Sequence, residues 1–243
     1  MANRPRLQPD TATGRKPSAR KPSAGTRPHR SVIPAEEASR PDRRAEILRS
    51  AEILIAQHGY HAVSVRDIAA HAGVPFALVG YYFGKKNELL KTMFEHRKAY
   101  ITERMARMRE VDTSRDNPQA VEDIVRAWAE PVVALRTDED GESFSVLVAR
   151  TMWEPGEEAS AIQQEYYDPL ATLFIDVMCK ALPGTKRDTV VWGYEFALGA
   201  LLMLVADRRV ERLSKHGATW GDPKQCERLI RFLTEGFLSM AKK

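Results

Sequence analysis

Residues 64–86 read SVRDIAAHAGVPFALVGYYFGKK, and the positions of their capping, Gly and Pro residues predict two short helices joined by a tight turn. Ser64 is a good N-cap with Asp67 three positions on, which approximates a capping box. Gly73 supplies the left-handed residue that ends the first helix. Pro75 restarts the chain in a first turn, where its missing N–H is not needed. The pattern is a helix-turn-helix, and the second helix of that motif enters the major groove of DNA.

The second helix of this pair is predicted to have one buried face. Val79 and Phe83 are spaced so that both point back to the small core of the motif. The positions left outward are Phe76, Leu78, Gly80 and Tyr81.

Residues 43–90 resemble the DNA-binding domain of the tetracycline-repressor (TetR) family of one-component regulators. Three strings carry the resemblance and fall in the family's order: AEILRSAEILIAQHGY, SVRDIAAHAGV and LVGYYFGKKNELL. The resemblance implies an all-α fold, in which a three-helix DNA-binding domain with a helix-turn-helix precedes a six-helix ligand-binding and dimerisation domain. It also implies a homodimer on a palindromic double-stranded DNA operator, with repression as the commoner outcome.

The resemblance also implies roles for single residues. Lys86 matches a position that contacts phosphate, Lys85 adds charge beside it, and Arg66 matches a position able to reach a guanine edge. Two residues depart from the family pattern. Lys85 replaces a capping Ser, and Gly80 replaces a tyrosine, which we interpret as allowing close approach of the backbone to the duplex. The candidate DNA-binding residues are Ser64, Arg66, Pro75, Phe76, Ala77, Leu78, Gly80, Tyr81, Tyr82, Lys85 and Lys86.

The chain divides into three predicted regions. Residues 1–40 are rich in Pro, Ser, Arg and Lys, and residues 1–30 hold eight basic residues and one acidic residue. Such a segment buries too little apolar surface to offset its ordering entropy, which predicts a disordered basic tail. It is either a cationic arm that contacts phosphates or a minor groove, or a solvated extension without a defined role. Residues 41–88 are the predicted DNA-binding domain, and residues 89–243 the ligand-binding and dimerisation domain.

Apolar periodicity with Pro and Gly boundaries predicts nine helices in all. Three belong to the DNA-binding domain, and the first of them begins at Asp42 or Ser39 and closes at Gly59. The six helices of the body are expected at 86–109, from 117 with a kink at Pro131, at 141–153, at 157–182 with an interruption at Pro169, at 188–213, and after Asp222 as cap with Pro223 in the first turn.

The body carries three strings, RTMWEP at 150–155, ALP at 181–183 and WGYEFALGALL at 192–202, that resemble one TetR subclass. Some regulators of that subclass resemble sensors of fatty acids or acyl-CoA. The implied effector is a small hydrophobic or amphipathic molecule, with an acyl compound and an aromatic drug-like compound as rivals. The candidate ligand-binding residues are Trp128, Arg150, Trp153, Tyr166, Tyr167, Trp192, Glu195 and Phe196.

Each of these ligand-binding candidates has a structural alternative. The aromatic residues can be core positions, because pockets and cores are lined by the same side chains. Arg150 can pair with Glu154 one helical turn away, and Glu195 can form an interfacial salt bridge.

Composition and motifs narrow the function classes. The chain is 43% hydrophobic and 29% charged, which is typical of soluble proteins. Its apolar runs fall short of the roughly 20 residues that span a bilayer, and its start lacks a signal-peptide core, so we expect a cytoplasmic protein without a membrane partner. Cys179 and Cys226 lack metal or disulfide spacing.

No GxSxG, HExxH or phosphate-binding loop is present, which argues against an enzyme and implies neither cofactor nor metal. The alternative function is a helical interaction module that has lost DNA binding, which the apolar residues Phe76 and Leu78 suggest.

Two expectations concern assembly and switching. By resemblance, the helices at 190–213 and 224–240 form a four-helix dimer interface, for which the suitable apolar residues are Leu198, Leu201, Leu202, Leu229, Leu233 and Phe237, unless these pack only inside the monomer. The switch is expected in the helix at 86–109, because it continues from the DNA-binding domain and packs a Met-rich side against the body.

Overall fold

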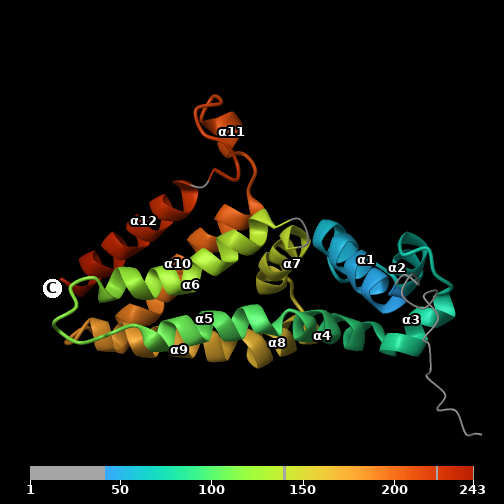
Figure 1. Cartoon of the computed structure of the whole chain (residues 1–243), viewed down its shortest axis with the longest axis horizontal. Helices are drawn as coiled ribbons and strands as arrows, with labels where there is room; N and C mark the ends of the chain where they lie inside the picture. The colour runs from blue at the N-terminus through green and yellow to red at the C-terminus, as the bar shows by residue number, and fades with distance from the viewer. Residues whose placement is uncertain (1–41, 139–140, 223, 243) are drawn as a thin grey trace, which may run out of the picture. The chain divides into compact units, whose positions relative to one another are not determined.

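The structure is a computed structural model that describes residues 42–138, 141–222 and 224–242. All regular secondary structure in these ranges is helical, as the sequence predicts. The predicted tail, residues 1–40, and Pro223 lie outside the described residues. The elements, shown in Figure 1, are α1 (Arg43–His58), α2 (Val65–His71), α3 (Phe76–Phe83), α4 (Lys86–His96), α5 (Lys98–Glu110), α6 (Ala120–Thr137), α7 (Glu142–Trp153), α8 (Glu157–Ile162), a π-helical turn (Gln163–Tyr167), α9 (Asp168–Ala181), α10 (Arg187–Ala206), α11 (Val210–Leu213) and α12 (Lys224–Ala241).

The predicted caps of the first two helices are present in the structure. The Asp42 carboxylate caps α1 by accepting two backbone N–H groups of its first turn. Ser64 and Asp67 form a full capping box at α2, in which the Ser64 N–H donates to Asp67 at 2.8 Å and the Asp67 N–H donates to Ser64 Oγ at 3.2 Å. Gly73 has the predicted left-handed φ of +63°, and Pro75 stands directly before α3 rather than inside its first turn.

The predicted helix at 86–109 is wrong as a single element, because it is divided into α4 and α5 at Arg97. Arg97 has φ and ψ of −98° and 7°, outside the helical values. Its guanidinium pairs with the buried carboxylate of Glu52 on α1, with Nη2 3.2 Å from Oε2. A contact with a residue 45 positions earlier in the chain leaves no local signal, and the periodicity of the sequence runs through the break.

Two more predicted helices are divided, so the described residues form twelve α-helices where nine helices were expected. The helix at 157–182 widens into the π-helical turn just before Pro169, which has no N–H to close an ordinary helical turn. The helix at 188–213 stops before Asp207, whose carboxylate accepts the Arg209 N–H at 2.9 Å and so replaces a helical hydrogen bond.

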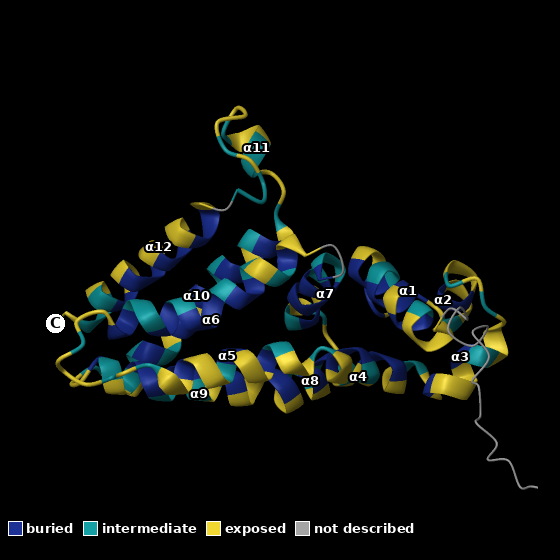
Figure 2. Ribbon diagram, in the orientation of Figure 1, coloured by how far each residue is buried: buried dark blue, intermediate teal, exposed yellow. Residues whose placement is uncertain are grey.

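Helix α6 packs against α5, α7, α9 and α12, and its buried face forms much of the core. Trp128 of α6 is 1% exposed, and its ring centroid lies 5.2 Å from that of Phe174 on α9. Phe94 of α4 meets Phe144 of α7 at 5.3 Å, and all four rings belong to one hydrophobic cluster. Figure 2 shows the buried residues on the facing sides of these helices and the exposed residues on the outer sides.

Helix α10 is long and apolar enough to cross a membrane by length and composition alone, with a mean hydropathy of 1.7. In the structure it packs against α7, α9 and α12. Only 39% of this apolar window is buried in the structure, so packing inside the body accounts for part of its apolar character.

Most apolar residues that the sequence assigns to a dimer interface are buried inside the monomer instead, which corrects that assignment. They are Leu201, Leu202, Leu229, Leu233 and Phe237, while Leu198 is partly buried against the same core. The reason is that α10 and α12 pack their strongest apolar faces on each other and on the body. The large apolar side chains that these two helices expose are Trp192, Phe196, Met203 and Phe232.

Candidate nucleic-acid interface and effector site

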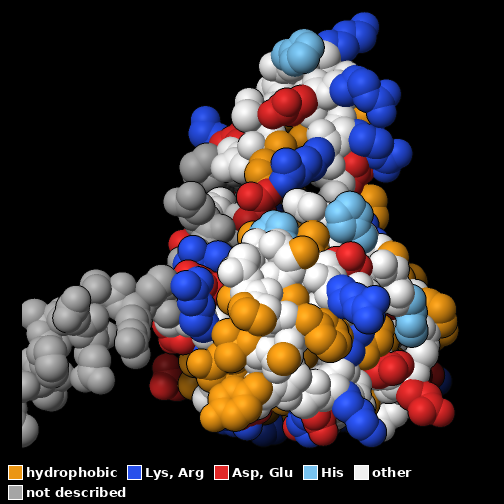
Figure 3. Space-filling model, turned by 90° about the vertical axis from the view of Figure 1, so that its right-hand side faces the viewer, with side chains coloured by type: hydrophobic (Ala, Val, Ile, Leu, Met, Phe, Trp, Pro, Cys, Tyr) orange, Lys and Arg blue, Asp and Glu red, His pale blue; other side chains and the backbone are white. Residues whose placement is uncertain are grey.

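The outward face of α3 carries most of the candidate DNA-binding residues. Val79 and Phe83 are buried in the core of the helix-turn-helix, as predicted, and this fixes which side of α3 faces solvent. Phe76 is 54%, Tyr82 40% and Tyr81 81% exposed. Figure 3 looks onto the face that bears α2 and α3 and shows hydrophobic side chains gathered there, with Lys and Arg side chains around them.

The remaining candidates lie in α3 or directly beside it and are mostly exposed. Ser64 and Arg66 are at the start of α2, and the Arg66 guanidinium lies 5.7 Å from the ring centroid of Phe76. The Lys85 N–H donates to Glu88 at 2.8 Å, so the acid of the first turn caps α4 without a capping Ser. The other exposed positions are Pro75, Ala77 and Gly80, and Leu78 is half-buried.

Lys86 differs from the other candidates because it already has partners inside the protein. Its ammonium donates to the Tyr60 carbonyl oxygen and lies 4.0 Å from the centroid of the Tyr60 ring. Burial lowers the pKa of Lys86, and the carboxylates of Glu154 and Glu158 oppose that shift. Lys86 therefore joins the start of α4 to the corner between α1 and α2.

The same corner is bound by two side chains at the end of α7. Glu154 Oε1 accepts the Tyr60 N–H at 3.0 Å, and Arg150 Nη2 donates to the Gln57 carbonyl oxygen at 2.9 Å. Gly59 between them has a φ of +87°. Among the described residues no ion pair joins Arg150 to Glu154, so both bind the backbone of the corner rather than each other.

Three of the eight ligand-binding candidates, Trp153, Tyr167 and Glu195, come together around a hollow of about 390 Å³. This volume lies toward the small end of the range for ligand sites, roughly 300–1,000 Å³. The other residues that line the hollow are Met152, Gln163, Asp168, Ala171, Tyr194, Leu198, Gly199 and Leu202.

The other five candidates lie elsewhere. Trp128 is a core residue, Arg150 faces α1, and the Tyr166 hydroxyl donates to Glu95 of α4 at 3.0 Å. Trp192 and Phe196 are each 62% exposed on one outer face of α10, with ring centroids 6.1 Å apart. The four-residue spacing that puts these two side chains on one face turns them away from the core.

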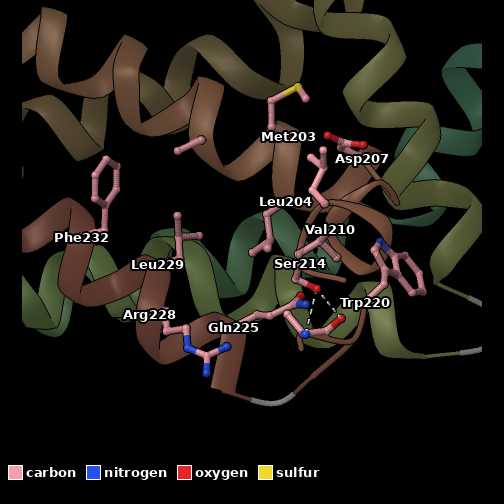
Figure 4. A pocket seen from close by; sticks show the side chains of 13 residues that line it. Met203, Leu204, Asp207, Val210, Ser214, Trp220, Gln225, Arg228, Leu229 and Phe232 are labelled. Atoms are coloured by element: carbon pink, nitrogen blue, oxygen red, sulfur yellow. Dashed lines mark hydrogen bonds between the residues drawn. The ribbon is translucent and has the colours of Figure 1, made fainter. Parts of the chain in front are cut away.

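A second hollow, of about 680 Å³, lies between α10, α11 and α12 and contains none of the predicted ligand-binding residues. Figure 4 shows Phe232 and Trp220 on opposite sides of it, with Gln225 and Arg228 along one edge. Ser214 holds the segment after α11 in place, because its Oγ accepts the Ala218 N–H at 2.9 Å.

Sequence reasoning missed two buried arginines, Arg104 and Arg136. Arg104 on α5 is 3% exposed and lies in the core beside Trp128. The available signal was its position three residues after Ile101 and four before Met108, both on the apolar face of α5, where an arginine is unexpected.

Two family models match the chain. The model described as "Bacterial regulatory proteins, tetR family" matches residues 47–93. The model described as "Tetracyclin repressor-like, C-terminal domain" matches residues 126–236, so the two together cover more than half of the chain. No curated protein matches the chain significantly.

Solved structures share the fold at low sequence identity. A TetR-family transcriptional regulator from Bordetella parapertussis is 17% identical with a TM-score of 0.59, and the match covers 82% of this chain and 98% of that one. The fatty acid degradation regulator FadR from Bacillus halodurans is 17% identical with a TM-score of 0.55, covering 81% and 97%. SmeT in its complex with triclosan is 16% identical with a TM-score of 0.52, covering 82% and 91%.

Proposed function

This chain belongs to the TetR family of bacterial regulatory proteins, and from that membership we propose that it is a cytoplasmic repressor. In this proposal a homodimer binds a palindromic operator and is released by a small hydrophobic ligand. Regulators of this family bind DNA and are not enzymes, and nothing in the chain's motifs calls for a catalytic role.

The observation that carries the proposal is the outward face of α3. Val79 and Phe83 bury its inner face and leave Phe76, Tyr81 and Tyr82 exposed, which supports their proposed contact with base edges and phosphates. Apolar and aromatic contacts suit thymine methyl groups, and Arg66 beside them suits a guanine edge.

The proposed effector site is the hollow lined by Trp153, Tyr167 and Glu195. Its lining combines apolar and aromatic side chains with the carboxylates of Asp168 and Glu195, and in this proposal the apolar part holds either rival ligand class. FadR is named as a regulator of fatty acid degradation and SmeT was solved with triclosan, an aromatic compound, so the structural neighbours include both classes.

The proposed dimer uses the exposed apolar side chains of α10 and α12. Trp192, Phe196 and Met203 follow one another along the outer side of α10, and Phe232 stands on the outer side of α12. Clustered exposed apolar side chains of this kind mark interaction surfaces.

DNA binding is tested with the purified full-length chain and sheared genomic DNA. Bound fragments are recovered, sequenced and measured again by fluorescence anisotropy at several salt concentrations. We expect a palindromic site whose affinity falls steeply with salt, since phosphate contacts release counterions. Failure to retain any fragment at low salt would favour the interaction module instead.

Three variants, each of which loses one positive charge, locate the contact. Arg66→Ala should weaken binding to the recovered site by about tenfold and relax the preference at one base pair, because it removes a contact to a base edge. Lys98→Ala, on α5 within the body, should leave the affinity unchanged. Lys85→Ala should reduce the salt slope by about one, as loss of a single phosphate contact does.

A further inference from the structure

The hollow of about 390 Å³ is lined by two carboxylates and by no basic side chain. Asp168 begins α9 and Glu195 lies on α10, so the two acids come from different elements. Both residues are exposed. Within the ranges that the structure describes, neither carboxylate forms an ion pair or accepts a hydrogen bond. The lining therefore carries two negative charges without a partner in the protein.

Two neutral polar side chains of the lining add further hydrogen-bond acceptors. The Gln163 amide nitrogen donates to the Thr151 carbonyl oxygen at 2.8 Å, which leaves the amide oxygen as an acceptor. Tyr167 is 8% exposed, and its hydroxyl has no hydrogen-bond partner among the described residues. A tyrosine hydroxyl oxygen accepts as well as donates. Acceptors therefore predominate among the polar groups that line the hollow.

Aromatic and apolar side chains make up most of the remaining lining. Trp153 at the end of α7 is 58% exposed, whereas Tyr167 and Tyr194 are buried, so the aromatic lining extends from the surface into the body. Aromatic ring faces attract cations, and tryptophan does so most strongly. The apolar members of the lining are Met152, Ala171, Leu198 and Leu202. This combination suits a ligand that has both a positive charge and an apolar part.

We propose that the effector is a lipophilic cation, whose positive charge is bound by Asp168 and Glu195 while its apolar part contacts the aromatic and apolar lining of the hollow. This inference rests on the proposed function, because it names the ligand class of the same site. An ammonium group supplies the counter-charge that both carboxylates lack and donates charge-assisted hydrogen bonds to them. An acyl acid would instead add a third negative charge to a hollow that already has two.

The buried Arg104 would favour an anionic ligand if its charge, rather than those of the carboxylates, dominated the hollow. Arg104 is 3% exposed, donates to the Trp128 carbonyl oxygen at 2.8 Å and does not line the hollow. The two possibilities differ in the sign of the ligand charge. Decylamine, decanol and decanoate have the same chain with positive, neutral and negative heads, and therefore separate the possibilities directly.

The experiment measures binding of these three compounds to the full-length chain by titration calorimetry, below their micelle concentrations. We expect decylamine to bind about tenfold more tightly than decanol, since each of two exposed ion pairs contributes up to about fivefold. Decanoate should bind more weakly than decanol. Added salt should weaken the binding of decylamine and leave that of decanol nearly unchanged, because salt screens exposed charges.

Variants of exposed side chains locate the charge without disturbing the core. Glu195→Gln and Asp168→Asn should each weaken decylamine binding by about threefold to fivefold and leave decanol binding unchanged. Glu110→Gln, at the exposed Glu110 of α5 outside the hollow, is the matched control and should bind decylamine as the wild type does. Trp153→Ala removes part of the lining that contacts the apolar chain, and should weaken decanol binding as well as decylamine binding.

Equal binding of decylamine and decanol, tighter binding of decanoate, or unchanged decylamine binding by both carboxylate variants would each overturn the inference. Operator affinity is measured separately, without ligand and with saturating decylamine, which should weaken it by at least fivefold. Unchanged operator affinity would show that the cation is not the effector.

The two proposals fail in different ways. A chain that binds decylamine through Asp168 and Glu195 but binds no DNA would refute the proposed function and leave the cation site standing. A chain that binds DNA but does not prefer decylamine would refute the cation site and leave the DNA-binding function standing.

Discussion

A Cβ atom added at Gly59 should destabilise the protein, whereas one added at Gly80 should stabilise it. Gly59 has a left-handed φ of +87°, and an added Cβ would lie 3.4 Å from Glu154 Oε1. Gly59→Ala should lower the free energy of unfolding by about 1–2 kcal/mol. Gly80 is in the middle of α3, and no atom lies within 4 Å of a Cβ added there. Gly80→Ala should therefore raise the free energy of unfolding by about 0.5–1 kcal/mol. Urea unfolding of the two variants measures both changes, and shifts of the same sign would contradict the reasoning.

Gly80→Ala also tests how closely the backbone of α3 approaches DNA. If the missing side chain is what allows close approach, the variant should be more stable and yet bind the operator more weakly. Unchanged operator affinity would show that position 80 needs no glycine for binding.

Asp67 gives the helix-turn-helix a dependence on pH. The Ser64 side chain, followed by the Ser64 N–H, holds the pKa of Asp67 below its usual value. A group whose pKa is lower in the folded state stabilises the fold above its unfolded pKa, about 3.9, and loses that contribution as the pH falls through the folded value. Asp67→Asn should therefore lose less stability than wild type between neutral pH and acid, as measured by thermal unfolding across pH. Parallel acid profiles would refute this role.

At the scale of elements, the division of one long helix into α4 and α5 changes how the switch is understood. A single lever from 86 to 109 would transmit any tilt to the DNA-binding helices. Two helices can instead bend at Arg97, which is itself paired with Glu52 of α1. The Arg97–Glu52 pair at this break thus links the body directly to α1, the first helix of the DNA-binding region.

The Arg97–Glu52 pair should matter far more than a surface pair of the same length. The Glu52 side chain is 5% exposed, so Arg97→Met would remove one charged hydrogen-bond partner of a buried carboxylate and should lower the free energy of unfolding by about 1.5–3 kcal/mol. The Lys98–Glu95 pair is also 3.2 Å long, but both side chains are more than half exposed. Lys98→Met should therefore change the free energy of unfolding by less than about 0.5 kcal/mol. Chemical denaturation compares the two variants, and similar small losses would show that the buried pair has no special weight.

At the scale of the whole molecule, the proposed dimer depends on side chains that have no role inside the monomer. Phe232 is 70% exposed, so Phe232→Glu should leave the stability of the monomer nearly unchanged while placing a charge in the proposed interface. Sedimentation should then show a dimeric wild type and a monomeric variant at micromolar concentration. The variant should also bind a palindromic operator much more weakly, because one recognition helix reaches only one half-site. Ala106→Glu, at the exposed Ala106 of α5, is the control and should remain dimeric.

Local signals were sufficient to predict the DNA-binding region. The caps at Asp42 and Ser64, the turn at Gly73 and the inward pair Val79 and Phe83 all depend on residues within a few positions of each other, and each occurs in the structure as predicted. Hydrogen bonds within one turn, and the period of the helix, act over the same short range that a sequence pattern samples. The sequence alone therefore determined the helix-turn-helix and the family.

Only the tertiary structure decided that the helix at 86–109 breaks at Arg97 and what the apolar faces of the body helices contact. Arg97 meets Glu52 across the fold, and Phe237 packs on Phe174 inside the monomer rather than on a partner. Arg104 of α5 donates to the Trp128 carbonyl oxygen of α6, which lies 24 positions along the chain. An apolar period shows that a face is buried but not against what, because the partner is chosen by packing between segments far apart in the chain.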